Sequence, residues 1–98
     1  MYLVRGQLLL HLKSYSEALK DFEKYNTLSQ NQAAGYIGLG DSYKGLKKFK
    51  EALACYNIAL EKQDYFVLTV LERRALLYFG NGEFTESLQD FNKVLKLT

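Results

Sequence analysis

A three-residue motif recurs along this chain at nearly constant spacing. Glu17-Ala18-Leu19 returns as Glu51-Ala52-Leu53, and again, with serine in place of alanine, as Glu86-Ser87-Leu88. The steps between copies are 34 and 35 residues. A period of this length is typical of solenoid arrays, in which each unit buries its apolar face by stacking on its neighbours. The sequence therefore predicts three copies of one structural unit.

The likeness between the copies extends well beyond the triplet and has helical spacing. We take Ala18, Ala52 and Ser87 as the reference position of each copy. Aromatic residues lie three positions before and four positions after it: Tyr15, Phe49 and Phe84, then Phe22, Tyr56 and Phe91. Twelve positions before it the residues are small, namely Gly6, Gly40 and Ala75. Bulky residues stand sixteen and nine positions before it: Tyr2, Tyr36 and Leu71, then Leu9, Tyr43 and Tyr78. Spacings of three and four indicate helices, not strands.

Each copy is predicted to form two helices joined by a short turn. We place the six helices at about residues 2–12 and 15–28, 32–46 and 49–62, and 65–79 and 84–97. Proline is absent and there are seven glycines, as expected for helices linked by tight turns. The predicted fold class is all-α, a solenoid of three antiparallel helix pairs in one domain, residues 1–98. The repeats cover about residues 1–30, 31–64 and 65–98.

Several short signals mark where these helices begin and end. Ser14 and Glu17 have the spacing of a capping box at the start of the second helix. Asn31 and Asp64 are candidate caps for the first helix of the second and third repeats. The run Gly80–Gly82 suits a turn with left-handed backbone.

The small residues of each copy predict a close contact between its two helices. In the second copy we expect Gly40 to approach Ala52, with the rings of Tyr36, Tyr43 and Tyr56 filling the space around the contact. Replacing Gly40 or Ala52 with leucine should overpack this contact and cost about 1–3 kcal/mol.

The composition offers little for catalysis. His11 and Cys55 are the single histidine and cysteine, so no Cys/His metal cluster can form, and a catalytic pair would need helices of different copies to meet. Gly35, Gly38 and Gly40 lie within a helical pattern, not between a strand and a helix as a phosphate-binding loop requires. We therefore expect no enzymatic activity, no cofactor, no metal and no small-molecule substrate.

Cysteine usage favours an intracellular, cytoplasmic protein over a periplasmic or secreted one, which stays an alternative. A single cysteine excludes an intrachain disulfide and is typical of a reducing compartment. Arg5 and Gln7 interrupt the apolar start, so we interpret residues 1–12 as a helix and not as a signal sequence. No apolar stretch approaches the ~20 residues that cross a bilayer. A net charge of +2 does not by itself indicate nucleic acid or a membrane surface as partner.

The second copy resembles the tetratricopeptide repeat family. The resemblance rests on Tyr36-Ile37-Gly38-Leu39-Gly40-Asp41-Ser42-Tyr43, followed by Ala52, Tyr56 and Ala59. The other copies depart from the family pattern at Arg5 and Leu9, and at Leu71, Arg74, Ala75 and Ser87. The usual closing proline is replaced by Gln30 and Asp64. The resemblance implies a right-handed superhelix whose concave groove is lined by the first helix of each repeat.

Mapped onto this chain, the resemblance implies a groove of mixed character. The expected lining residues are Leu3, Gln7 and Leu10, then Ala34, Ile37, Asp41 and Lys44, then Thr69, Glu72, Arg73, Leu76 and Phe79. Apolar pockets flanked by charges suit an extended or helical peptide. The predicted function is a protein-interaction module or scaffold that binds a partner protein or peptide. Lys44, Arg73, Asp41 and Phe79 are the residues most worth mutating first.

One known subclass of the family, the clamp for chaperone C-terminal carboxylates, is not expected here. The matching positions are Leu3, Gln7, Gly38, Thr69 and Arg73, of which only Arg73 agrees with the clamp. Without the clamp's lysines and asparagines, the charge-assisted hydrogen bonds to a terminal carboxylate are mostly missing.

An architectural role is the first alternative. The last helix carries Leu88, Val94, Leu95 and Leu97, and this face is a candidate for stacking on further repeats or on a second copy of the chain.

An RNA-contacting helical repeat is the second alternative, and it is disfavoured. Lys44, Lys47, Lys48 and Lys50 form the densest basic run, close to Tyr43 and Phe49. Both aromatics lie in the packing register and are expected to be buried. RNA binding would weaken steeply with added salt.

Overall fold

The computed structural model describes residues 1–29, 33–62 and 67–98, and these form six α-helices and no strand. The helices are α1 (Tyr2–His11), α2 (Tyr15–Leu28), α3 (Ala33–Gly45), α4 (Phe49–Glu61), α5 (Val67–Gly80) and α6 (Phe84–Leu97). The predicted all-α class and the six predicted helices are confirmed, with ends that differ by at most one residue where the predicted end lies within the described residues; the predicted starts at residues 32 and 65 lie outside them. The predicted caps Asn31 and Asp64, and Gln30, lie outside the described residues.

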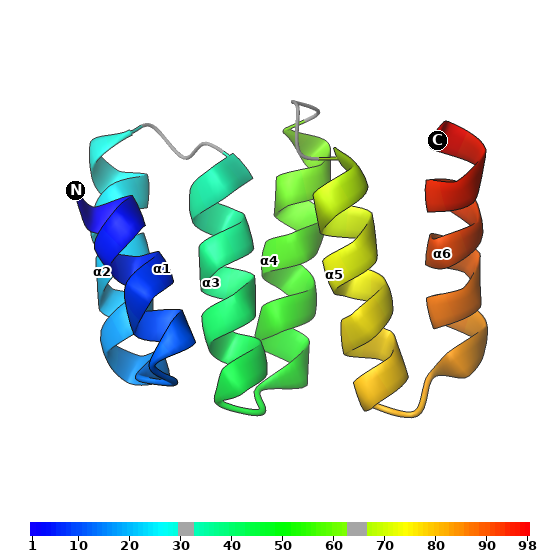
Figure 1. Ribbon diagram of the computed structural model, residues 1–98, viewed down its shortest axis with the longest axis horizontal. Coiled ribbons are helices and arrows are strands. Elements are labelled where there is room, and N and C mark those ends of the chain that lie inside the picture. The colour runs from blue at the N-terminus through cyan, green and yellow to red at the C-terminus, as the bar shows by residue number, and fades with distance from the viewer. Residues whose placement is uncertain (30–32, 63–66) are drawn as a thin grey trace.

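The three helix pairs follow one another in chain order along the longest axis of the molecule (Figure 1). Antiparallel pairs form between α1 and α2, α3 and α4, and α5 and α6, while α3 packs on α2 and α5 packs on α4. The first helices also contact one another, α1 with α3 and α3 with α5. The stack measures 34 × 26 × 19 Å, with the two termini at opposite ends. This is the helix-pair solenoid that the repeat predicts.

The three turns within the helix pairs have the same geometry. Lys13, Lys47 and Gly82 occupy the same repeat position and all have positive φ, at 61°, 62° and 81°. In the first turn the N–H of Lys13 donates to the carbonyl of Leu10 at 3.0 Å, and the N–H of Ser14 donates to that of Leu9 at 2.8 Å. The second and third turns repeat both bonds, which define a Schellman motif. The predicted left-handed backbone at the third turn is confirmed at Gly82.

The predicted capping box at the start of α2 is wrong. Ser14 is the N-cap of α2, but its side chain makes no capping hydrogen bond. Because Ser14 also closes the Schellman motif, its ψ is held at 68°, away from the extended conformation in which an N-cap side chain reaches back to the helix. The turn is therefore held by the backbone and not by the side chain of Ser14.

Phe22 joins the first two repeats. Its side chain is fully buried, and it lies against glycines of two different helices, Gly6 of α1 and Gly38 of α3. A Cβ on Gly6 would stand 2.9 Å from the ring, and a Cβ on Gly38 would overlap it more severely. The small residues therefore make room for a ring inside one repeat and between two repeats.

Gly40 has the same relation to Tyr56 within the second repeat. The sequence predicted Ala52 as the partner of Gly40, but the side chain nearest to Gly40 is the ring of Tyr56, four residues later. Gly40, Ala52 and Tyr56 are all buried, as is Ala75 at the equivalent small position of the third repeat. The small residues twelve positions before the reference residue are therefore buried packing positions, as predicted. In the first two repeats, the aromatic residue four positions after the reference residue packs against them.

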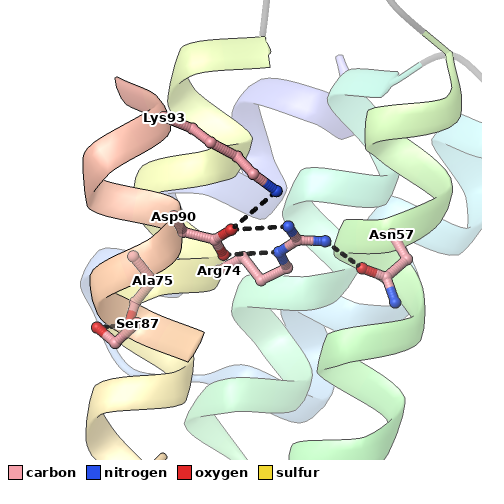
Figure 2. Close-up of polar contacts among 6 residues, drawn as sticks. All are labelled: Asn57, Arg74, Ala75, Ser87, Asp90 and Lys93. Carbon is pink, nitrogen blue, oxygen red and sulfur yellow. Dashed lines mark hydrogen bonds and ion pairs between the residues drawn. The ribbon is translucent and has the colours of Figure 1, made fainter. Parts of the chain in front are cut away.

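Two buried carboxylates form ion pairs at equivalent places in the first and third repeats. Arg5 donates to Asp21 through Nε and Nη2 at 2.7 and 2.8 Å. Arg74 donates to Asp90 with the same two distances (Figure 2). Both pairs are bidentate, the geometry in which an Arg–carboxylate contact is strongest. These arginines depart from the family pattern, and the structure gives the reason: each has a carboxylate partner on the second helix of its own repeat.

The second repeat fills the same two positions with apolar side chains. Leu39 replaces the arginine and Cys55 replaces the aspartate, and both are buried, at 8% and 9% exposure. One chain therefore contains an ionic and an apolar solution to the same packing site.

Candidate functional site

A hollow of about 830 Å³ opens on the side formed by the first helices of the repeats. Its lining residues come mainly from α1, α3 and α5, with additions from α2 and the second turn: Leu3, Gln7, Leu10, His11, Tyr15, Phe22, Ala34, Ile37, Gly38, Asp41, Lys44, Gly45, Lys47, Thr69 and Arg73. On the three first helices these residues recur at intervals of three and four, so each helix turns one face to the hollow. We call this surface the groove.

Most of the residues predicted from the sequence line this groove. Leu3, Gln7, Leu10, Ala34, Ile37, Asp41, Lys44, Thr69 and Arg73 all belong to its lining. Glu72, Leu76 and Phe79, also predicted, do not. Leu76 and Phe79 are 46% and 60% exposed, and the ring of Phe79 packs edge-on against Phe84 with 5.5 Å between centroids. Whether the lining residues bind a partner stays a prediction.

The carboxylate of Asp41, which lines the groove, is already paired within the chain. Asp41 accepts hydrogen bonds from the Tyr56 hydroxyl and from the guanidinium of Arg73, which also forms an ion pair with it. Burial, and next the charge of Asp41, raise the pKa of the Tyr56 phenol, so the hydroxyl stays protonated and donates. The bond from Arg73 ties α5 to α3. Asp41 and Arg73 are thus engaged with each other before any partner arrives.

One end of the groove is basic. Lys44, at the end of α3, and Lys47, in the turn that follows, are both exposed, and neither forms an ion pair within the described part of the chain. His11, the last residue of α1, lines the same hollow. With Asp41 balanced by Arg73, the two lysines give the groove a positive charge with no opposing carboxylate among its lining residues. Such a charge attracts acidic segments.

The floor of the groove is apolar. Ile37 is buried at 8% exposure, and Leu3 and Leu10 are half-buried. Because Gly38 lacks a side chain, the fully buried ring of Phe22 packs directly behind the floor from α2. An apolar floor beside a basic end is suited to a segment that carries both apolar and acidic side chains.

Six lining residues lie outside the groove set predicted from the sequence: His11, Tyr15, Phe22, Gly38, Gly45 and Lys47. Tyr15 and Phe22 belong to α2, and their rings come close to the groove because they pack against the glycines Gly45 and Gly38 of α3. Lys47 faces the groove because of its left-handed backbone, for which a lysine gives no signal. His11, the last residue of α1, also lines the hollow.

The remaining candidates for chemistry are separated. Cys55 lies in a core cluster with Ala18, Phe22 and Leu39, whereas His11 lines the groove. Burial raises the pKa of the Cys55 thiol to about 11, so the thiol is protonated and weakly nucleophilic at neutral pH. Across the residues that the structure describes, no group of three or more metal-ligating side chains occurs. Over the same residues, no helix has the length and apolarity needed to cross a bilayer.

The aromatics of the basic run, which the sequence predicted to be buried, are only partly buried. Tyr43 and Phe49 are half-buried against the core clusters, and Phe49 packs against Tyr78 with 6.2 Å between ring centroids. Lys48 and Lys50 next to them are exposed.

Stacked helix pairs with a groove along the first helices define the class of helical repeat proteins. Comparison with known families makes the assignment specific: tetratricopeptide repeat profiles match residues 1–32 and 37–98. The chain belongs to the tetratricopeptide repeat family. No curated protein matches the chain.

Solved structures with this arrangement include two of MamA. A fragment titled MamA 41-end, from Desulfovibrio magneticus RS-1, superposes with a TM-score of 0.87 at 21% identity over 98% of this chain. A MamA point mutant superposes with a TM-score of 0.82 at 24% identity over 99% of this chain. The chain spans 54% of the first of these structures and 70% of the second. At this identity the likeness concerns the fold.

Proposed function

We propose that this domain is a protein-interaction module whose groove binds an extended, acidic segment of a partner protein. Membership of the tetratricopeptide repeat family supports a scaffold role, since repeats of this kind present binding surfaces and in general no catalytic site. The observation that carries the choice of partner is the unopposed charge of Lys44 and Lys47 beside an apolar floor.

In this proposal the groove recognises its partner by two kinds of contact. Apolar side chains of the segment pack on Leu3, Leu10 and Ile37, which supplies binding free energy through burial. Acidic side chains pair with Lys44 and Lys47, which sets the direction of the segment and raises the association rate. Arg73 orders the groove through Asp41 and contributes less directly to the partner.

The groove is not proposed to clamp a chaperone C-terminal carboxylate. Its five clamp-equivalent positions line the hollow, but four are Leu3, Gln7, Gly38 and Thr69, and the fifth, Arg73, is already paired with Asp41. This leaves few charge-assisted donors for a terminal carboxylate at those positions.

Selection from a random peptide library tests the proposal, followed by fluorescence-polarisation titration of the enriched peptides. We expect acidic peptides with interspersed apolar residues, and about a tenfold loss of affinity in the Lys44→Ala/Lys47→Ala double variant, which corresponds to about 1.4 kcal/mol. Lys20→Ala/Lys24→Ala is the matched control, because it removes the same charge from exposed positions of α2 outside the groove lining. Equal losses in both variants, or enrichment of basic or purely apolar peptides, would contradict the proposal.

A further inference from the structure

Two apolar faces are exposed, one on the first helix and one on the last. At the N-cap of α1, Met1 is 95% exposed, and on α1 itself Val4 and Leu8 are 60% and 58% exposed. On α6, Phe84 and Leu95 are 62% and 72% exposed. In Figure 1 these two helices lie at opposite ends of the stack. Because the chain is a repeat, the exposed residues of each face can be compared with the equivalent residues of the inner helices.

The α6 face occupies positions that the following repeat covers elsewhere. Phe84 is equivalent to Phe49 of α4, whose ring packs against Tyr78 of α5. Leu95 is equivalent to Leu60 of α4, which packs against the core cluster that includes side chains of α5. The face of α6 thus has the composition of a surface on which a first helix packs.

The α1 face occupies positions that pack on the preceding repeat elsewhere. Leu8 is equivalent to Ser42 of α3 and Leu77 of α5, which are 0% and 5% exposed. Met1 is equivalent to Val70 of α5, which is fully buried. Val70 and Leu77 both belong to the core cluster that contains side chains of α4. The exposed face of α1 is therefore the face that α5 turns toward α4.

A hydrogen bond across the α4–α5 interface has its two equivalent residues on α1 and α6. Arg74 of α5 donates through Nη1 to Oδ1 of Asn57 of α4 at 2.8 Å (Figure 2). The residues equivalent to this pair are Arg5, on α1, and Asn92, on α6. The Arg5 side chain is 59% exposed, against 15% for Arg74. The two halves of an interrepeat hydrogen bond thus stand at opposite ends of one chain.

We propose that the chain stacks head to tail on a second copy of itself. Helix α1 of one copy packs on α6 of the other as α5 packs on α4, and Arg5 of one copy donates to Asn92 of the other. His11 is equivalent to Gly45 and Gly80. A Cβ at Gly45 would overlap the Tyr15 ring in the α2–α3 interface, whereas a Cβ at Gly80 would meet nothing within 4 Å, so the contact follows the α4–α5 arrangement, which has room for a side chain there. Because the two contacting surfaces differ, the contact leaves a free face at each end and growth continues beyond the dimer.

The test is the concentration dependence of the mass in sedimentation equilibrium. We expect the mass of the parent chain to rise from 11.3 kDa at low concentration past twice that value at roughly millimolar concentration. Leu8→Glu and Leu95→Glu, each at an exposed site, should both be monomeric, whereas their equimolar mixture should form a heterodimer through the two intact faces. Gln89→Glu is the matched control on α6, since its equivalents Lys20 and Ala54 stay exposed within the stack, and it should associate like the parent.

Asn92→Ala tests the register of the contact. It should weaken association about three- to tenfold, as loss of a hydrogen bond to a charged, partly exposed group predicts. A parent chain that stays monomeric would overturn the proposal and leave the two faces to other segments or partners. Self-association of Leu8→Glu would overturn it in favour of α6 pairing with α6, and an unchanged Asn92→Ala would overturn the register. None of these results depends on peptide binding in the groove.

Discussion

The ionic pair of the third repeat can be exchanged for the apolar pair of the second, and this exchange gives a quantitative prediction. Asp90 is 3% exposed and Arg74 is 15% exposed, so water screens the pair poorly. The test variant is Asp90→Cys, because the second repeat has a cysteine, Cys55, at the equivalent position. It leaves the Arg74 guanidinium inside the repeat without its carboxylate.

Removal of one partner of a buried pair costs about 3–5 kcal/mol, because the other charge remains buried and uncompensated. Arg74 keeps its bond to Asn57 and some contact with water, so we expect the lower end of that range. At about 4 °C per kcal/mol or more for a domain of this size, the melting temperature should fall by roughly 12 °C.

The double variant Arg74→Leu/Asp90→Cys should recover most of this loss. Replacement of a buried ion pair by apolar side chains of suitable shape is often neutral or stabilising. The double variant also gives up the bond to Asn57, so we expect it within about 2 kcal/mol of the parent. The two substitutions would then be strongly coupled, by about 2 kcal/mol or more.

Urea denaturation of the parent, both single variants and the double variant, in reducing buffer, measures these free energies of unfolding. The first repeat supplies the control: Asp21→Cys leaves Arg5, which at 59% exposure is solvated by water, so the loss should be smaller than that of Asp90→Cys. The reasoning is refuted if Asp90→Cys costs less than about 1 kcal/mol, or if the two single losses simply add in the double variant.

Three further predictions concern packing, turns and pH. Gly38→Ala should cost about 1–3 kcal/mol in urea denaturation because its Cβ overlaps the Phe22 ring, whereas Gly80→Ala, with open space around its Cβ, should not destabilise the fold; equal losses would contradict this packing. Lys47→Gly should increase the free energy of unfolding by up to about 1 kcal/mol and raise the melting temperature, because glycine adopts the left-handed backbone of this turn without strain. A lowered melting temperature would contradict the turn geometry. Hydrogen bonds from Arg5 lower the pKa of Asp21 in the folded chain. The stabilising contribution of Asp21 is therefore fully present above its unfolded pKa of about 4 and is lost as the pH falls through its folded pKa. In Asp21→Asn, the free energy of unfolding should change less with pH over this range.

The helix pairs were predictable because their signal is distributed over every repeat. Glycine or alanine twelve positions before the reference residue, and an aromatic residue four positions after it, recur three times, and each column reports on packing. The sequence predicted that Gly40 approaches Ala52 with the rings of Tyr36, Tyr43 and Tyr56 around the contact, but a column of small residues does not say which of these side chains comes nearest. The structure assigns that place to Tyr56.

Other features depend on geometry that residue type does not encode. Lysine gives no sign of left-handed backbone, yet Lys13 and Lys47 adopt it because the Schellman motif of the turn requires it. The ion pairs were detectable in principle: Arg5 and Arg74 depart from the repeat pattern together with an aspartate sixteen residues later, and the second repeat lacks both. A comparison of paired departures between repeats, and not of single columns, would have identified them.

The most direct test of the account is the location of the bound peptide on the domain. The account predicts that a nuclear magnetic resonance titration of the ¹⁵N-labelled chain with a selected acidic peptide shifts the amide signals of the groove, with Ile37 and Lys44 among the largest changes. The signals of Lys20 and Lys24 on α2 should stay in place. Shifts confined to α2, α4 and α6, with an unperturbed groove, would contradict the central claim that the first helices of the repeats form the binding surface.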